Sequence, residues 1–347
     1  MKILISGYYG FGNAGDELIL ETIVSELSAK LEGVALTVLS VNPRETSETH
    51  KLRAVNRWNL FKVIREIAAC DILISGGGGL FQDSTGSIGL YYYLLIIFLA
   101  KLAGKKIYIY GAGVNNLKYL NRIITAKIFK LADGITVRER ESFNLLVNWG
   151  LPKDKIVVTA DPVMLKEVKA GRHVQDKPTV VFILRPPVKS RWSVELFSKL
   201  ADALAQRLKA DIVFMPFHPQ NDREYSLCIM HMMKAKASLV EWKKFDDIYE
   251  TVGKADLVIS QRLHGLILAL LYGIPLIGIS EDTKIDRFLK ELGQKNISLM
   301  TEENYYSVLA VILDMWEWRD EFKKTAKKIL PHFRLRAKKN SEMPFLY

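Results

Sequence analysis

The feature that most constrains this chain is the regular alternation of short apolar runs with longer segments of helical periodicity. In the N-terminal half, we predict strands at residues 2–6, 35–41, 71–75, 106–110, 134–138 and 155–160. The helices predicted between them cover residues 16–31, 60–69, 89–102, 120–131 and 142–148. Strands and helices that alternate in this way form a parallel sheet with helices on both faces.

The same alternation returns after a polar stretch at residues 168–178. We predict strands at residues 179–184, 211–215, 256–260, 275–279 and 297–300. The predicted helices cover residues 194–209, 222–234, 245–253, 263–272 and 284–292, and a long helix runs from about residue 303 to 329. A chain of 347 residues is too long for one ordinary hydrophobic core.

These elements predict an α/β protein with two doubly wound, Rossmann-like domains that face a central cleft. The first domain covers residues 1–167, a linker covers 168–178, and the second domain covers 179–315. Residues 316–347 are predicted to form a C-terminal helix and a basic tail. In such folds, ligands bind at the carboxyl ends of the strands.

The composition favours a globular protein with an anionic partner. Hydrophobic residues make up 49% of the chain and charged residues 25%, and the formal net charge is +11. That positive charge could attract nucleic acid, anionic lipid or a phosphorylated substrate. Cys70 and Cys228 lie among apolar helical residues without metal-ligand spacing. We therefore expect reduced core cysteines, as in cytosolic proteins, and no metal site.

Targeting segments are not expected. Residues 1–6 lead directly into a glycine turn and then Asp16 and Glu17, which does not fit a secretory signal peptide. The most apolar run, residues 90–102, is shorter than the roughly 20 residues that a membrane span needs. We predict a buried helix there and a cytoplasmic protein.

Basic residues follow three predicted strands of the second half. Arg185 follows residues 179–184, His218 follows 211–215 and Arg262 follows 256–260. Because carboxyl ends of parallel strands meet at one edge, we expect these side chains to converge. Packing alone does not explain three basic groups at one edge, so we predict an anion-binding site. Lys284, after the next strand, could join them or lie on the surface.

The segment SQRLHG at residues 260–265 joins one of these strands to a helix. Its turn presents Arg262 and His264 beside the backbone N–H groups of Leu263 and Gly265, where the helix dipole also favours an anion. We count Ser260, at the strand end, among the binding residues. The plain alternative is a strand-to-helix turn with a surface arginine and a hydrogen-bonded histidine.

The segment GFGNAG at residues 10–15 has the spacing of a dinucleotide-binding loop. Asp16 and Glu17 at the helix start would repel a pyrophosphate, and the second strand does not end in an acid for a ribose. We therefore expect Asn13, Gly15 and Asp16 to face the cleft and bind hydroxyl groups. A tight turn with an acidic helix cap is the alternative.

Three further groups end predicted strands of the first half. Glycines 76–79 follow residues 71–75, and Gly77 and Gly78 would let the backbone form an anion-binding nest, unless they only make the loop flexible. Arg138 closes the fifth strand and either faces the cleft or begins a solvated helix. Asp161 ends the next strand, as a cleft carboxylate or as part of an Asp-Pro turn.

The C-terminal tail is basic and lies near aromatic residues. Residues 323–339 could contact nucleic acid or a membrane surface, or form a solvated basic face. The chain contains no nucleic-acid motif that we recognise, and we expect Pro331 to break the helix. Trp316, Trp318, Phe322 and Phe333 favour a membrane surface over nucleic acid.

Taken together, the motifs resemble those of the polysaccharide pyruvyl transferase family, in particular the bacterial cell-wall CsaB type. They are GNAGDE (12–17), GGGG (76–79), RERES (138–142), PFHPQND (216–222) and SQRLHG (260–265). The resemblance covers about residues 1–300, and the combination of GNAGDE with SQRLHG is the most specific part of it.

The resemblance implies a GT-B-like fold and transfer of a pyruvyl group from phosphoenolpyruvate to two hydroxyls of a sugar. The product is a cyclic ketal, and phosphate is released. In the CsaB type the acceptor is N-acetylmannosamine in a lipid-diphosphate-linked cell-wall glycan precursor, and the modified glycan anchors S-layer proteins. Phosphoenolpyruvate is a co-substrate, and neither a cofactor nor a metal is implied. On the strength of the basic cluster alone, we place phosphoenolpyruvate in the second domain and the acceptor in the first.

For this chemistry, a general acid must protonate phosphoenolpyruvate, and a base must act on the sugar hydroxyl. His264 is the candidate acid, with His218 as an alternative or a phosphate ligand. Asp16 or Asp161 could be the base. Arg185 and Arg262 would neutralise the carboxylate and the phosphate.

Two other classes of function remain open. A nucleotide-sugar glycosyltransferase would share the fold and could use Glu241 or Glu281 for the ribose. A non-catalytic protein that binds anionic glycans or lipid surfaces would need no histidine. The expected partners are phosphoenolpyruvate, the lipid-linked acceptor and an anionic membrane surface, but not nucleic acid. The expected location is cytoplasmic, at the inner face of the membrane.

Overall fold

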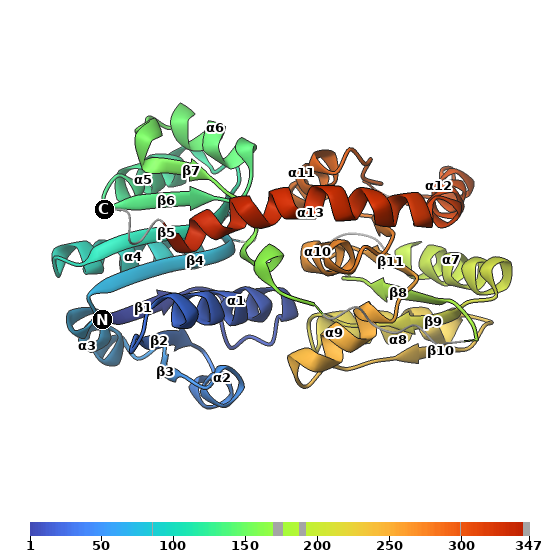
Figure 1. Cartoon of the computed structure of the whole chain (residues 1–347), viewed down its shortest axis with the longest axis horizontal. Helices are drawn as coiled ribbons and strands as arrows, with labels where there is room; N and C mark the ends of the chain where they lie inside the picture. The colour runs from blue at the N-terminus through green and yellow to red at the C-terminus, as the bar shows by residue number, and fades with distance from the viewer. Residues whose placement is uncertain (85, 169–175, 187–191, 299, 343–347) are drawn as a thin grey trace. The chain divides into compact units, whose positions relative to one another are not determined.

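The chain folds into two α/β units, each built on a parallel sheet, as predicted (Figure 1). The computed structural model describes residues 1–84, 86–168, 176–186, 192–298 and 300–342. Unit 1 comprises Met1–Leu165 and the described residues from His332 onward, and unit 2 comprises Lys166–Pro331. Of the predicted linker, residues 169–175 lie outside the described residues.

Within the described residues, the sheet of unit 1 has seven strands in the order β3-β2-β1-β4-β5-β6-β7. Their bounds are β1 (Lys2–Ser6), β2 (Ala35–Ser40), β3 (Arg53–Asn56), β4 (Ile72–Phe81), β5 (Lys106–Val114), β6 (Gly134–Val137) and β7 (Ile156–Val158). The strand order reverses between β1 and β4, which pair in parallel. This switch point is where doubly wound folds bind their ligands.

The helices of unit 1 cover both faces of this sheet. They are α1 (Ala14–Lys30), α2 (Pro43–His50), α3 (Leu60–Ala69), α4 (Ile88–Leu102), α5 (Tyr119–Phe129) and α6 (Arg140–Asn148), with short 3-10 turns at Lys153–Lys155 and Pro162–Leu165. Crossovers between parallel strands are right-handed, so α1 and α2 lie on one face and α3, α4 and α5 on the other. The prediction missed α2 and β3.

The sheet of unit 2 has five strands within the described residues, in the order β10-β9-β8-β11-β12. The strands are β8 (Thr179–Ile183), β9 (Asp211–Phe214), β10 (Ala237–Leu239), β11 (Leu257–Ser260) and β12 (Leu276–Gly278). The order reverses between β8 and β11. The strand predicted at residues 297–300 is wrong for the part that the structure describes, since Ile297 forms an isolated bridge with Ile279 there; residue 299 lies outside the described residues.

Helices also flank the sheet of unit 2. They are α7 (Trp192–Leu208), α8 (Asn221–Met232), α9 (Phe245–Gly253), α10 (Leu263–Tyr272), α11 (Thr283–Glu291) and α12 (Tyr305–Glu317). Helix α10 ends at Gly273, whose φ of 69° lies in the left-handed region. The helix predicted at residues 263–272 is thus confirmed with the same bounds, and glycine is the residue that suits this end.

The last helix, α13 (Arg319–Glu342), begins in unit 2 and ends in unit 1. It passes through Pro331, so the prediction that this proline breaks the helix is wrong. In unit 1, Asn340 accepts a hydrogen bond from Thr159 Oγ1 (2.8 Å) and donates one to the Ala160 carbonyl (2.9 Å). Because these contacts hold the end of the helix, they offset the backbone hydrogen bond that the proline removes.

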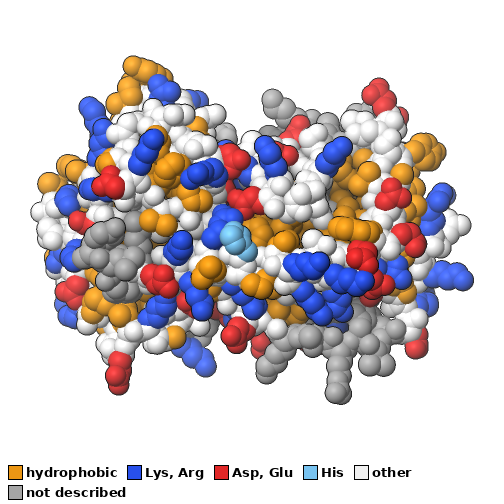
Figure 2. All heavy atoms as spheres, turned by 45° about the horizontal axis from the view of Figure 1, so that its top comes forward, with side chains coloured by type: hydrophobic (Ala, Val, Ile, Leu, Met, Phe, Trp, Pro, Cys, Tyr) orange, Lys and Arg blue, Asp and Glu red, His pale blue; other side chains and the backbone are white. Residues whose placement is uncertain are grey.

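Two of the aromatic side chains near the basic tail that we expected at a membrane surface are buried instead. Phe322 and Phe333 are buried, so neither is available to a membrane. Lys and Arg side chains are spread over the visible surfaces of both units, in line with the net charge of +11 (Figure 2). None of the helices in the described residues combines the length and the apolar character needed to cross a bilayer.

The two cysteines lie in different surroundings. Cys70 is buried, as predicted, whereas Cys228 on α8 is exposed, so the prediction of two core cysteines is wrong for Cys228. Burial raises the pKa of the Cys70 thiol to about 11. Among the described residues, no group of three or more His, Cys, Asp and Glu side chains has the arrangement of a metal site.

Candidate functional site

Arg262 is fixed at the start of α10 by a carboxylate from the start of α8. Arg262 Nε donates to Asp222 Oδ2 at 3.0 Å, and Nη2 donates to Oδ1. The Asp222 side chain is completely buried, whereas that of Arg262 is 22% exposed. This two-point contact fixes the plane of the guanidinium group.

Asp222 also joins the loop after β9 to the loop after β11. Its Oδ2 accepts the backbone N–H of His218 at 3.0 Å, so His218 and Arg262 share one carboxylate. Sequence reasoning gave Asp222 no role, because its place at the start of a predicted helix does not show which side chain its carboxylate meets. His218 Nδ1 is buried and has no hydrogen-bond partner within the described residues.

Ser260 and Gly265 shape the turn that carries Arg262. Ser260 Oγ accepts the Arg262 N–H at 2.9 Å and lies 2.7 Å from the Arg262 carbonyl oxygen. A Cβ at position 265 would lie 2.6 Å from Ser260 Oγ and 2.8 Å from Ile183 Cδ1, so only glycine fits. The Gly265 N–H donates to the Arg262 carbonyl at 3.1 Å. This corrects the expectation that the Gly265 N–H is directed at an anion.

His264 lies on the first turn of α10, two residues after Arg262, and its side chain is half-buried. Leu263, the first residue of the helix, is buried. The helix start therefore carries the imidazole and the guanidinium at the dipole end that favours an anion. This is the arrangement expected from SQRLHG.

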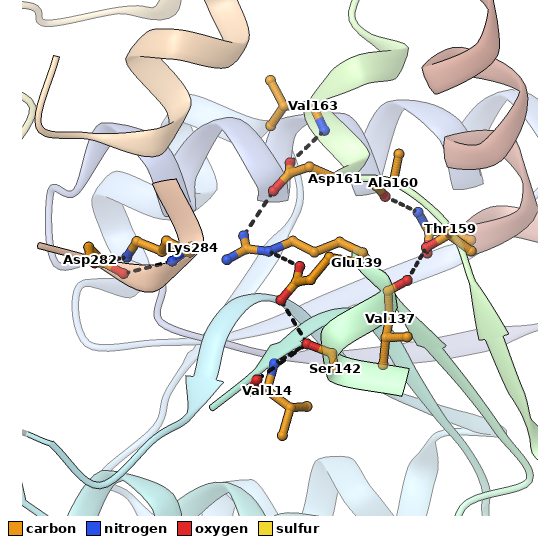
Figure 3. Close-up of polar contacts among 12 residues, drawn as sticks. Val114, Val137, Glu139, Ser142, Thr159, Ala160, Asp161, Val163, Asp282 and Lys284 are labelled. Atoms are coloured by element: carbon orange, nitrogen blue, oxygen red, sulfur yellow. Dashed lines mark hydrogen bonds and ion pairs between the residues drawn. The ribbon is translucent and has the colours of Figure 1, made fainter. Parts of the chain in front are cut away.

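A second cationic group forms around Asp282. Its Oδ2 lies 3.4 Å from Arg185 Nη1 and 3.2 Å from Lys284 Nζ, and Figure 3 shows the contact with Lys284. Burial acts to raise the pKa of Asp282, but Lys284 and Arg185 outweigh it, and the pKa lies below its usual value. The backbone N–H of Arg185 donates to Gln261 Oε1 at 3.0 Å, which links this group to the SQRLHG turn.

The structure therefore places these cations on both sides of the switch point of unit 2. Arg185 follows β8, and Arg262 follows β11, which is the neighbouring strand. Arg185, Arg262 and Lys284 bring two guanidinium groups and an ammonium group to this edge, where Asp222 and Asp282 orient them. An anion of the size of a phosphate or carboxylate fits the chemistry of this edge.

In unit 1, side-chain hydrogen bonds join the start of α1 to the loop between β1 and α1. Gly10 donates its N–H to Glu17 Oε1 at 2.8 Å, and Glu17 Oε2 lies 3.1 Å from His50 Nε2. Asn13 caps α1, since its Oδ1 accepts the Gly15 N–H at 3.1 Å. The alternative of a tight turn with a capped, acidic helix start thus describes Asn13 and Gly15.

The glycine run lies inside β4, not after it, so the predicted loop position is wrong. Gly77 and Gly78 have φ values of 73° and 83°, which favour glycine, and the register with β5 shifts after Gly78. A Cβ at Gly77 would overlap Ile19, and one at Gly78 would lie 3.1 Å from Asp16 Oδ1. The glycines let α1 cross β4 closely and place Asp16 beside the switch point of unit 1.

Arg138 forms buried ion pairs with both Asp161 and Glu139 (Figure 3). Arg138 Nη1 donates to Asp161 Oδ2 at 2.9 Å, and Arg138 Nε donates to Glu139 Oε2 at 3.1 Å. Glu139 Oε1 accepts Ser142 Oγ at 2.7 Å, and Asp161 Oδ1 accepts the Val163 N–H at 3.1 Å. The alternative of a solvated helix start is wrong here, because all three charged groups are buried.

The sequence profile of the polysaccharide pyruvyl transferase family matches residues 13–283, which include the SQRLHG turn and the glycine run. A curated relative is the amylovoran biosynthesis protein AmsJ of Erwinia amylovora. It is 22% identical over 364 residues, which cover 84% of this chain and 86% of AmsJ.

Solved structures with similar folds confirm the fold class. The UDP-GlcNAc 2-epimerase of Neisseria meningitidis, bound to UDP-GlcNAc, has a TM-score of 0.70 at 14% identity, with both chains fully covered. Anabaena Alr3699/HepE in complex with UDP-glucose has a TM-score of 0.66 at 14% identity. The match covers 99% of this chain and 98% of Alr3699/HepE. The fold is thus GT-B-like, with two Rossmann-like α/β domains.

Proposed function

Because this chain belongs to the polysaccharide pyruvyl transferase family, we propose that it transfers a pyruvyl group from phosphoenolpyruvate to two hydroxyls of one sugar. The acceptor is an N-acetylmannosamine residue of a lipid-diphosphate-linked cell-wall glycan precursor, and the enzyme works at the cytoplasmic face of the membrane. The name of the family supports a polysaccharide acceptor, and the similarity to AmsJ, an amylovoran biosynthesis protein, supports a role in biosynthesis.

The observation that carries this proposal is the pair of cationic groups at the switch point of unit 2. Phosphoenolpyruvate has a phosphate and a carboxylate on neighbouring positions of a three-carbon unit. Arg262, oriented by Asp222, and Arg185, beside Lys284, supply separate counter-charges for two such anions. The start of α10 adds the positive end of a helix dipole.

The reaction requires a proton at C3 of phosphoenolpyruvate. His264 donates this proton, and positive charge develops at C2. The oxygen of the first sugar hydroxyl then attacks C2. The C2–O bond to phosphate breaks, and the second hydroxyl closes the ketal. Of the two hydroxyl protons, one restores the proton used at C3, and the other leaves with the phosphate. General acid catalysis of this type contributes about 10²–10⁴-fold.

Asp16 is our candidate for the base on the sugar hydroxyl. Asp161 was the alternative, but both of its carboxylate oxygens hold structural partners, Arg138 and the Val163 N–H. Asp16 lies instead at the switch point of unit 1, against Gly78. We therefore assign Arg138 and Asp161 to positioning of the loop after β7 rather than to proton transfer.

The role of His264 is tested by substitution with alanine. We expect a loss of at least about 10²-fold in turnover for His264→Ala, with unchanged thermal unfolding. His231→Ala is the matched control, because His231 is an exposed histidine in the last turn of α8. Turnover of His264→Ala near that of the control would show that His264 is not the acid.

A further inference from the structure

Exposed hydrophobic side chains are concentrated in one part of unit 1. Twelve of the nineteen large hydrophobic residues that are exposed in the described part of the chain lie between Trp58 and Ile124. Single exposed hydrophobic residues are common in folded proteins, but contiguous groups mark contact surfaces. The concentration therefore needs a partner to explain it.

Helix α4 has two apolar faces, and only one of them is packed. Its buried face includes Leu90, Tyr93, Leu94 and Ile97. The residues of the other face are spaced by three or four, and each is 41% to 84% exposed: Ile88, Tyr91, Leu95, Phe98 and Leu102. A helix that is apolar all round is normally buried on all sides. The buried helix predicted at residues 90–102 is thus only half buried.

The neighbouring helices extend this surface. Helix α4 packs against α3 on one side and α5 on the other. Exposed apolar residues on α3 are Leu60, Phe61 and Ile64, and those at the start and middle of α5 are Tyr119, Leu120 and Ile124. We call these residues and the exposed stripe of α4 the α3–α5 apolar face. Because three adjacent helices contribute, the face is a surface rather than a single stripe.

The charges around this face are mainly positive. Residues 58–130 contain nine Lys and Arg but only three acidic residues. Of the acids, Asp83 is buried and Glu66 is paired with Arg53. Lys62 on α3 and Arg122 on α5 are exposed. Two copies of such a face would repel each other, whereas an anionic surface would be attracted.

We propose that the α3–α5 apolar face docks on an anionic lipid bilayer. The hydrophobic side chains enter the boundary between headgroups and acyl chains, and the surrounding lysines and arginines contact lipid phosphates. Docking there would bring the enzyme to the membrane that holds its lipid-linked acceptor, and this role rests on the proposed function. The basic tail, where Phe322 and Phe333 are buried, is not needed for it.

The test is co-sedimentation of the full chain with vesicles of phosphatidylglycerol and phosphatidylcholine in equal parts. The apolar variant combines Phe61→Gln, Leu95→Gln and Phe98→Gln. Its matched control combines Leu227→Gln, Tyr306→Gln and Val311→Gln, which replaces exposed side chains of unit 2. We expect the apolar variant to bind at least about 100-fold more weakly than wild type and the control to bind normally.

A charge variant tests the electrostatic part. Replacing Lys62 and Arg122 with glutamine should weaken binding roughly fivefold per residue at low salt. Vesicles of phosphatidylcholine alone should bind wild type weakly. All of these substitutions are at exposed positions, so thermal unfolding should stay near that of wild type.

Three results would overturn the proposal. The first is that wild type fails to sediment with the anionic vesicles. The second is that the apolar variant binds the vesicles as strongly as wild type does. The third is a wild-type dimer in light scattering that the apolar variant dissociates, without any vesicle binding. Pyruvyl transfer to a water-soluble acceptor should be the same in the apolar variant and wild type. A failure of the proposed reaction would therefore appear there and leave the vesicle result unaffected.

Discussion

The contact between Asp222 and Arg262 fixes the orientation of Arg262 and links it to the loop that carries His218. Asp222 is completely buried and accepts two hydrogen bonds from the guanidinium of Arg262 and one from the His218 N–H. The substitution Asp222→Asn keeps the shape of the side chain but removes its charge, and it turns one acceptor into a donor that faces Arg262. We expect this variant to lose both stability and affinity for phosphoenolpyruvate.

The magnitude follows from the burial of the two partners. Breaking a fully buried ion pair costs about 3–5 kcal/mol. Arg262 is 22% exposed, and water can replace part of what it loses. We therefore expect a loss of about 2–3 kcal/mol of unfolding free energy for Asp222→Asn, and a coupling of about 2 kcal/mol with Arg262→Gln. The KM for phosphoenolpyruvate should rise about tenfold, because the guanidinium is no longer held in one plane.

The assay is a double-mutant cycle of Asp222→Asn and Arg262→Gln, measured by urea unfolding and by steady-state kinetics. If Asp222 acts through Arg262, the KM of the double variant should match that of Arg262→Gln alone. Effects that simply add, in both unfolding free energy and KM, would refute the reasoning. Asp314→Asn is a suitable control, because this carboxylate is exposed on α12 and belongs to neither of the helix starts that carry Asp222 and Arg262.

Three further predictions concern packing, pH and thiols. Gly265→Ala should destabilise the fold by about 1–3 kcal/mol in urea unfolding, because the new Cβ would press on Ser260 Oγ; unchanged stability would contradict the packing described. Although burial acts to raise the pKa of Asp282, its cationic neighbours lower it, so its ionised form stabilises the fold above about pH 4. That contribution is lost as pH falls through the lowered pKa, and Asp282→Asn should flatten the acid side of the stability profile. A thiol reagent at neutral pH should modify exposed Cys228 rapidly and Cys70 slowly, because burial raises the pKa of Cys70 to about 11; equal rates would contradict this.

Sequence reasoning was sufficient for the strand ends of unit 2. Arg185 and Arg262 follow apolar runs that are buried strands, and parallel strands bring their carboxyl ends to one edge. The rule holds without knowledge of side-chain packing. The cations were therefore located correctly, before their partners were known.

The partners could not be found in this way. Asp222 precedes Arg262 by forty residues, and nothing in their local sequence indicates that they meet. The glycine run at 76–79 was read as a loop, because glycine disfavours strands, yet the close crossing of α1 over β4 requires it. Tertiary contacts decide both cases.

Other elements lacked the local signal on which prediction depends. Helix α2 has the polar sequence PRETSETH, without a repeated apolar face, and β3 and β10 are only a few residues long. Helix α4 posed the opposite problem. Because it is apolar on all sides, its periodicity cannot show which face is packed and which is exposed.

The most direct test of the account is phosphate release from phosphoenolpyruvate, with and without a synthetic lipid-diphosphate disaccharide that ends in N-acetylmannosamine. Mass spectrometry of the acceptor follows in the same reaction. The account predicts release that depends on the acceptor, together with the mass gain of one pyruvyl ketal. No release with this acceptor, and consumption of a UDP-sugar instead, would contradict it and identify a nucleotide-sugar glycosyltransferase on the same fold.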